Sequence, residues 1–322
     1  MKTMLRTIAV ALVGTAMAGA ASAQSFPAKP VKFVVPFAPG GTSDIVARSI
    51  GQKLGERWGQ PVVVENKPGG ATTIGADQVA KSPADGYTIL LAPAPFVIVQ
   101  YAYPKLPYDT RRDFTPVSLL VTGPLVIAVN SDGPLKTMDA FLAYLKANPG
   151  KLNYGSPGNG SLPHLAIELF KMRSGTDITH VPYRGGGPAV VDLVGGRIDV
   201  LFASLPEVQP HVQSGKLKVI GVTSPQRWPV MPDLPTVNEK GLSGYEALSW
   251  FGVMAPAGVP QDLVARISAD IVAVLKADDV RSRLTDQGMD VVGSTPEAFG
   301  AFLDREHARW SEVVKTVNVK IE

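Results

Sequence analysis

The sequence contains no cysteine in its 322 residues. Without thiols the chain can form no disulfide bond, no thiolate metal site and no cysteine nucleophile. Its four histidines, His164, His180, His211 and His307, show no metal-ligand spacing. We therefore expect no bound metal and no cofactor, and a fold that depends on its hydrophobic core alone.

Motifs of several common activities are also missing. GxxxxGK[ST], GxGxxG and GxSxG do not occur, which argues against a phosphate-binding loop, a dinucleotide site and a nucleophile elbow. No residues resemble a nucleophile with its general base, so a secreted hydrolase is the disfavoured interpretation. The net charge is only +3, with no basic run, so we expect no nucleic-acid partner.

The N-terminus has the three parts of a secretory signal peptide. Lys2 and Arg6 form a basic region, residues 8–19 are apolar, and residues 21–23 match an A-x-A cleavage site. The apolar run is shorter than the roughly 20 residues of a membrane-spanning helix, which argues against an anchor. We expect cleavage after Ala23 and a mature, soluble protein in the periplasm that begins at Gln24.

The sequence is rich instead in segments where glycines join an expected strand to an expected helix. In VPFAPGGTSDIVAR, the apolar run 31–37 ends at a glycine pair. Thr42 or Ser43 is expected to cap the following helix, with Asp44 in its first turn. The free N–H groups and dipole of such a helix start can hold an anion. An ordinary strand-to-helix connection is the competing interpretation.

Two further segments repeat this design. LNYGSPGNGSLPHLAIELF places Ser161 as a helix cap with Pro163 behind it, and HVPYRGGGPAVVD has three glycines before Pro188. Strands and helices alternate along most of the chain, except in 93–116, which is expected to be irregular. This alternation is typical of α/β folds that bind ligands at the carboxyl ends of parallel strands. Two facing turns would hold a molecule with a carboxylate at one or both ends.

The order of these segments resembles the Bug (TctC-like) family of periplasmic solute-binding proteins, which serve tripartite tricarboxylate transporters. The resemblance implies a two-lobed, type II Venus-flytrap fold, each lobe a mainly parallel sheet flanked by helices. Lobe one would comprise 26–123 plus 251–322 and lobe two 124–250, joined by crossing strands near 124–128 and 248–254. The matching segments are VPFAPGGTSDIVAR, VVVENKPGGATTIGADQVAKSPADGYTILLA, KLPYD, DFTPVSLL, LNYGSPGNGSLPHLAIELF, HVPYRGGGPAVVDLVGGRIDVLFAS and WFGVMAPAGVP.

The resemblance also implies ligand contacts from the glycine turns of both lobes. Asp44 is expected to brace its turn rather than touch an anion. For Arg184 a ligand carboxylate and a surface ion pair are alternatives, and for His164 a ligand contact and a packing or surface role. The candidate residues are Phe37, Ala38, Gly40, Gly41, Thr42, Ser43, Asp44, Ala94, Phe96, Ser156, Gly158, Asn159, Gly160, Ser161, His164, Tyr183, Arg184 and Ser204.

Two departures from the family pattern bear on the ligand. Many members carry small polar residues and a histidine where this chain has PAPFVI, which includes Ala94 and Phe96. Some members have an aspartate where this chain has Ser204. An apolar wall at Phe96 and no carboxylate for an ammonium group favour an aromatic or otherwise apolar carboxylate over an amino acid. Core packing is the competing interpretation of Phe96.

The function implied by the resemblance is delivery of a small carboxylate, aromatic or an apolar dicarboxylate, to the membrane permease subunits of such a transporter. The protein is expected to act as a monomer. A sensing subunit that presents the bound carboxylate to a signalling receptor is the alternative, because it would use the same binding site.

Overall fold

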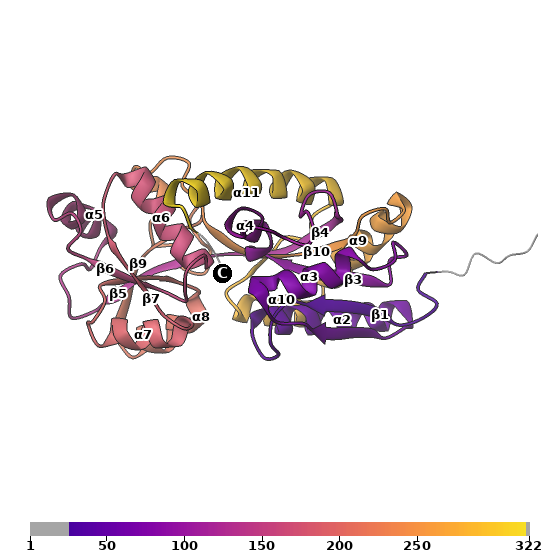
Figure 1. Ribbon diagram of the computed structural model, residues 1–322. Coiled ribbons are helices and arrows are strands. Elements are labelled where there is room, and N and C mark those ends of the chain that lie inside the picture. Colours follow the sequence, from indigo (N-terminus) through magenta and orange to yellow (C-terminus); the bar gives the residue numbers. More distant parts are fainter. Residues whose placement is uncertain (1–25, 320–322) are drawn as a thin grey trace, which may run out of the picture.

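The computed structural model describes residues 26–319. The predicted signal peptide and its cleavage site lie outside these residues. Two β-sheets, each covered by helices, form two lobes that lie side by side (Figure 1). In the described part of the chain, no helix combines the length and the apolar character needed to cross a membrane.

The sheet of lobe one has six strands in the order β11-β4-β10-β3-β1-β2. Three of them, β1, β2 and β3, are parallel, and the others extend the sheet in antiparallel pairs. β1 and β3 are almost wholly buried apolar runs, as expected of strands covered on both faces. The strands are β1 (Val31–Val35), β2 (Val62–Asn66), β3 (Thr88–Pro93), β4 (Phe114–Pro124), β10 (Leu248–Pro256) and β11 (Asp290–Val291).

Helices cover both faces of this sheet. A short 3₁₀ turn, η1, precedes α3 at the end of β2, and the long C-terminal helix α11 runs along one side of the molecule (Figure 1). The helical elements are α2 (Thr42–Trp58), η1 (Gly70–Thr72), α3 (Thr73–Ala80), α4 (Pro95–Ala102), α9 (Gln261–Leu275), α10 (Asp278–Asp286) and α11 (Pro296–Val317).

The sheet of lobe two has five strands in the order β7-β6-β8-β5-β9, in which β7, β6 and β8 are parallel and β5 is antiparallel to both its neighbours. Its elements are β5 (Val126–Asn130), α5 (Met138–Ala147), β6 (Asn153–Ser156), α6 (Leu162–Ser174), β7 (Thr179–Pro182), α7 (Gly186–Val194), β8 (Val200–Ala203), α8 (Leu205–Gln213), β9 (Leu217–Val222) and η2 (Asn238–Lys240).

The chain passes between the sheets where β4 leads into β5 and again where β10 begins. Leu248, the first residue of β10, pairs with Pro124, the last residue of β4. This second crossing therefore lies just before Leu248, and the predicted division of the lobes at residues 250 and 251 stays a proposal. Beside the crossings, Trp228 of lobe two donates from Nε1 to Asp290 Oδ1 of lobe one at 3.1 Å.

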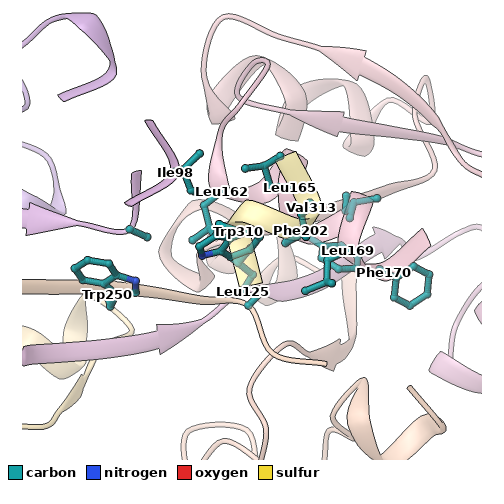
Figure 2. Close-up of a cluster of buried hydrophobic side chains, with 14 of the residues drawn as sticks. Ile98, Leu125, Leu162, Leu165, Leu169, Phe170, Phe202, Trp250, Trp310 and Val313 are labelled. Atoms are coloured by element: carbon teal, nitrogen blue, oxygen red, sulfur yellow. The ribbon is translucent and has the colours of Figure 1, made fainter. Parts of the chain in front are cut away.

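The end of α11 connects the lobes in addition to the two crossings. Trp310 and Val313 of α11 are fully buried and belong to one continuous core with α6. Figure 2 shows these two side chains among Leu162, Leu165 and Leu169 of α6, with other members of the same core around them. Lobe two is therefore held to lobe one by packed side chains as well as by the crossing strands.

The prediction that 93–116 is irregular was wrong at both ends of the segment, although 103–113 contain no helix or strand. Pro95 begins α4 in a first-turn position, where proline is tolerated because its missing N–H has no helical partner. The apolar residues that follow are buried on all sides of this helix, and Phe114 begins β4, which the sequence analysis missed. Pro95 therefore marks the start of a helix, whereas Pro104 and Pro107 lie in the loop that follows it.

Candidate functional site

The carboxyl ends of the parallel strands in the two sheets face each other. In lobe one, Pro93 at the end of β3 pairs with Phe251, close to the crossing before Leu248. In lobe two, Ala203 at the end of β8 pairs with Val126, the first residue of β5 after the other crossing. Both edges therefore lie toward the crossings, and they carry the glycine turns that precede α2, α6 and α7.

The first turn leaves the start of α2 uncapped. Gly40 has φ +91°, which glycine adopts without strain, and Gly41 is the N-cap. Within residues 26–319, the N–H groups of Gly41, Thr42 and Ser43 donate to no acceptor. The prediction that Thr42 or Ser43 caps the helix was wrong, because α2 begins at Thr42 itself. The turn thus presents free donors at the positive end of a helix dipole.

Asp44 braces this turn from below, as predicted. Its carboxylate accepts from the Gly40 N–H at 3.1 Å, from Arg48 Nε at 2.9 Å and from Asn66 Nδ2 at 3.0 Å. The same Asn66 amide donates to the Phe37 carbonyl at 3.1 Å. The Arg48 guanidinium, followed by the Asn66 and Gly40 donors, lowers the pKa of Asp44 to about 2. Asp44 is buried, so its carboxylate interacts with groups of the protein itself.

The Thr42 hydroxyl makes a contact that the sequence did not predict. Its Oγ1 donates to Gln287 Oε1 at 3.2 Å. Gln287 follows α10, and the next residue, Gly288, lies against Leu205 and Trp228 of lobe two. This segment therefore connects the first turn to the other lobe.

The second turn, between β6 and α6, satisfies its own polar groups. Ser161 is the N-cap of α6, as predicted, and its Oγ accepts from the His164 N–H at 3.4 Å. The same hydroxyl donates to the Gly158 carbonyl at 2.7 Å. Gly160 has φ +74° and donates its N–H to His164 Nδ1 at 3.1 Å. Asn159 is the exposed residue of the turn.

His164 therefore contacts the turn rather than open solvent. Its side chain is buried, and its ring stacks on His180 from β7 with centroids 4.1 Å apart. The packing alternative of the sequence analysis describes this residue. His180, which no sequence pattern singled out, also contacts the turn, because its Nε2 lies 2.6 Å from Ser156 Oγ.

The third turn, between β7 and α7, presents a cation. Arg184 is exposed and forms no ion pair with any residue of 26–319, so the surface ion pair expected as an alternative is not observed. The neighbouring Tyr183 hydroxyl donates to Asp192 Oδ2 at 2.7 Å. Tyr183 is thereby fixed within lobe two.

The segment after β8 contains a carboxylate three residues beyond Ser204, at Glu207. Ser204 donates from Oγ to Glu207 Oε1 at 3.0 Å. The other carboxylate oxygen, Glu207 Oε2, lies 2.6 Å from the place that a Cβ on Gly186 would occupy, at the start of α7. The absence of an aspartate at this position therefore does not leave the third turn without negative charge.

The apolar wall predicted at Phe96 is not observed. Phe96 is 0% exposed and packs edge-on against Phe114 and in parallel with Tyr108. Ala94 lies beside it at the carboxyl end of β3, 2% exposed. Core packing, the competing interpretation, describes Phe96, because α4 turns its first residues into the centre of lobe one.

The structure thus places the candidate residues in two groups on facing sheet edges. Phe37 to Asp44 and Ala94 lie after the ends of β1 and β3, Phe96 lies in α4 of the same lobe, and the remainder lie at or after the ends of β6, β7 and β8. Sequence reasoning missed Asn66, Arg48 and His180. Arg48 had a local signal, its spacing of four from Asp44 on a helix. No three His, Asp or Glu side chains of 26–319 gather as a metal site.

Comparison with known proteins places this geometry in a family. Residues 46–319 match the family described as the tripartite tricarboxylate transporter family receptor. The chain is 40% identical over 311 residues to a protein from the tcbD-tcbE intergenic region of Pseudomonas sp. (strain P51), covering 96% of this chain and 92% of the relative. It is 37% identical to protein BugT of Bordetella pertussis, covering 100% and 99%.

Solved structures agree. Rpa4515 of R. palustris with adipate has a TM-score of 0.77 and 36% identity, covering 92% of this chain and 99% of that one. MatC (Rpa3494) from Rhodopseudomonas palustris with bound malate has a TM-score of 0.74 and 35% identity, covering 90% and 100%. The chain therefore belongs to the tripartite tricarboxylate transporter receptor family of periplasmic solute-binding proteins, whose members are receptors and not enzymes.

Proposed function

We propose that this protein captures a small dicarboxylate between its glycine turns and delivers it to the membrane permease subunits of a tripartite tricarboxylate transporter. The observation that carries the proposal is the uncapped start of α2. Its three free N–H groups, at Gly41, Thr42 and Ser43, offer one carboxylate both hydrogen bonds and a favourable helix dipole.

The second carboxylate would be held by lobe two. Arg184 is exposed and unpaired among residues 26–319, and a guanidinium can bind a carboxylate through two parallel hydrogen bonds. The exposed Asn159 at the second turn adds an amide side chain on the same sheet edge. A ligand with charge at both ends would then contact both lobes and favour their closure.

The relatives with bound adipate and malate support this ligand class, because both molecules are short dicarboxylates. The predicted preference for an aromatic ligand loses its two supports. Phe96 is buried in the core, and Glu207 supplies a carboxylate near the third turn. We therefore propose a dicarboxylate without an aromatic preference.

A ligand panel tests this proposal. Adipate, malate, succinate, benzoate, aspartate and citrate would be screened by thermal shift and then measured by calorimetry. A ligand present at 100 times its Kd raises the free energy of unfolding by about 2.7 kcal/mol, which a melting curve detects easily. We expect dicarboxylates to bind more tightly than benzoate. Tighter binding of benzoate, or no binding by any member, would contradict the proposal.

Delivery and export need tests of their own. A strain without this protein should lose uptake of the bound dicarboxylate and regain it with the wild-type chain but not with Gly41→Val. The intact mass of periplasmic protein should correspond to a chain that begins at Gln24. Uptake that persists without the protein would argue for the sensing alternative.

A further inference from the structure

Three aromatic rings form a stack directly beneath the second turn. Tyr154 on β6 and His180 on β7 are neighbours in the sheet register, and their ring centroids lie 4.7 Å apart. His164 on α6 also stacks on His180, with centroids 4.1 Å apart and planes within 13°, and its centroid lies 6.3 Å from that of Tyr154. Side chains from β6, β7 and α6 thus meet beneath the second turn, although none of the three residues is part of the turn.

The two imidazoles hold the turn at both ends. His164 Nδ1 accepts from the Gly160 N–H, so this nitrogen carries no proton and the ring proton lies on Nε2. His180 Nε2 bonds to Ser156 Oγ, which itself lies 3.2 Å from both the nitrogen and the carbonyl oxygen of Gly158. The shape of the segment from Ser156 to Ser161 therefore depends on both rings, and the Gly160 bond requires that His164 be neutral.

The charged groups near the stack are one lysine and two carboxylates. Tyr154 donates to Glu168 Oε1 at 2.6 Å, and Lys171 Nζ lies 3.1 Å from the same oxygen and 3.5 Å from Asp177. Burial lowers the pKa of His164, and burial followed by the nearby His164 lowers the pKa of His180 to about 4. Both rings are thus neutral at neutral pH.

We propose that His164 and His180 are positioning residues for the ligand: their rings hold the second turn in its binding shape, and proton uptake by His164 releases the turn and weakens binding. A protonated His164 would turn an N–H toward the Gly160 N–H, and two donors cannot bond. The proposal rests on the proposed function only where it concerns the ligand.

Two variants of His164 distinguish the role of its hydrogen-bond acceptor, Nδ1, from the role of its ring packing. In His164→Asn, the amide oxygen can take the place of Nδ1 and does not titrate, whereas His164→Leu removes the acceptor. With adipate as the probe at pH 7.5, we expect His164→Asn to stay within about threefold of wild type and His164→Leu to lose roughly tenfold or more, the value of one hydrogen bond.

The pH profile of adipate binding provides the sharper readout. Between pH 7.5 and 5, the wild-type Kd should rise more steeply than that of His164→Asn, and the comparison cancels the titration of adipate itself. His211→Asn is the matched control, because His211 lies on α8 outside the stack, and it should keep the wild-type profile. Equal profiles for wild type and His164→Asn, or unchanged binding by His164→Leu, would overturn the proposal.

A ligand-free measurement keeps this test independent of the proposed function. In ¹⁵N spectra, the Gly160 amide signal should move with the same midpoint as the His164 ring nitrogens on acidification. A Gly160 signal that ignores the His164 titration would overturn the positioning role. If adipate and the other dicarboxylates fail to bind wild type, the proposed function fails while this titration still decides the role of the imidazoles.

Discussion

The first and second glycine turns have the same local design but are braced in opposite ways. Below the first turn lies a charged carboxylate, Asp44, whose pKa is about 2. Below the second lie two neutral imidazoles, His164 and His180. The helix after the first turn begins with free N–H groups, and the helix after the second is capped by Ser161. Two turns with the same strand-to-helix design can therefore differ in their properties because different side chains support them.

This difference assigns the turns different parts in binding. Asp44 keeps its charge at every physiological pH, so the first turn should hold its shape under all conditions that the periplasm meets. His164 accepts from the Gly160 N–H only while its ring stays unprotonated. The first turn is thus suited to grip an anion constantly, and the second to respond to acid.

The largest effect is expected from Gly41→Val. A Cβ on Gly41 would meet no atom within 4 Å, so the variant should fold, but the added side chain lies where a ligand carboxylate would bind. Calorimetry with a dicarboxylate should show a loss of at least about 100-fold, or 2.7 kcal/mol. The melting temperature serves as the folding control, and near-wild-type affinity would remove the first turn from the site.

Gly160→Val makes the matching change in the second turn and should behave differently. Gly160 has φ +74°, a conformation that strains a β-branched residue. This variant should lose stability as well as binding. Equal melting temperatures for the two variants would contradict the distinction.

Acidification should come next in size. His164, His180 and His307 are all neutral in the folded state, and burial lowers the pKa of His180 and of His307 to about 4. The unfolded chain binds more protons below its ordinary histidine pKa of 6.5, so stability falls as pH decreases from 6.5 toward 4. Urea unfolding at pH 7.5 and 5 should differ by roughly 3 kcal/mol. Equal stabilities at both pH values would refute the neutral state of these rings.

Asp44→Ala should destabilise the protein by about 2 kcal/mol, because it leaves the Gly40 and Asn66 donors without their acceptor. The loss should be smaller than for a fully buried ion pair, since Arg48 is 54% exposed. Asp44→Asn, which keeps one acceptor oxygen, is the milder control. The wild-type contribution of Asp44 should persist at pH 5 and fall only as pH drops from 3.8 toward 2.

The smallest expected effects are the losses of stability when residues at the starts of α2 and α6 are changed. Ser161→Ala removes a true N-cap and should cost about 1 kcal/mol in urea unfolding. Thr42→Ala should cost less than about 0.5 kcal/mol, because Thr42 does not cap α2. A larger loss for Thr42→Ala than for Ser161→Ala would reverse the assignment of the caps.

The sequence predicted those features of the two turns that depend on residues close together in the chain. The glycine turns, the Ser161 cap and the bracing by Asp44 each depend on residues within a few positions of one another. The stack of His164 on His180 depends on the pairing of β6 with β7 in lobe two, and the bond of Asn66 to Phe37 depends on the pairing of β1 with β2 in lobe one. Such pairings cannot be read from spacing, so these residues were missed.

The misassigned segment 93–116 has a different cause. Its prolines suggest a loop, but proline is equally suited to the first turn of a helix. The apolar residues after Pro95 are buried between the sheet and α11, so tertiary packing decides the structure there. The expected contact of Phe96 with a ligand was wrong for the same reason.

The central claim, that both turns receive one ligand, is tested most directly by titrating the ¹⁵N-labelled protein with adipate and following backbone amide signals. The account predicts that the signals of Gly41, Thr42 and Ser43 and those of Asn159, Gly160 and Ser161 shift together with one Kd. Shifts confined to one turn, or shifts that leave both turns unchanged while adipate binds elsewhere, would contradict it.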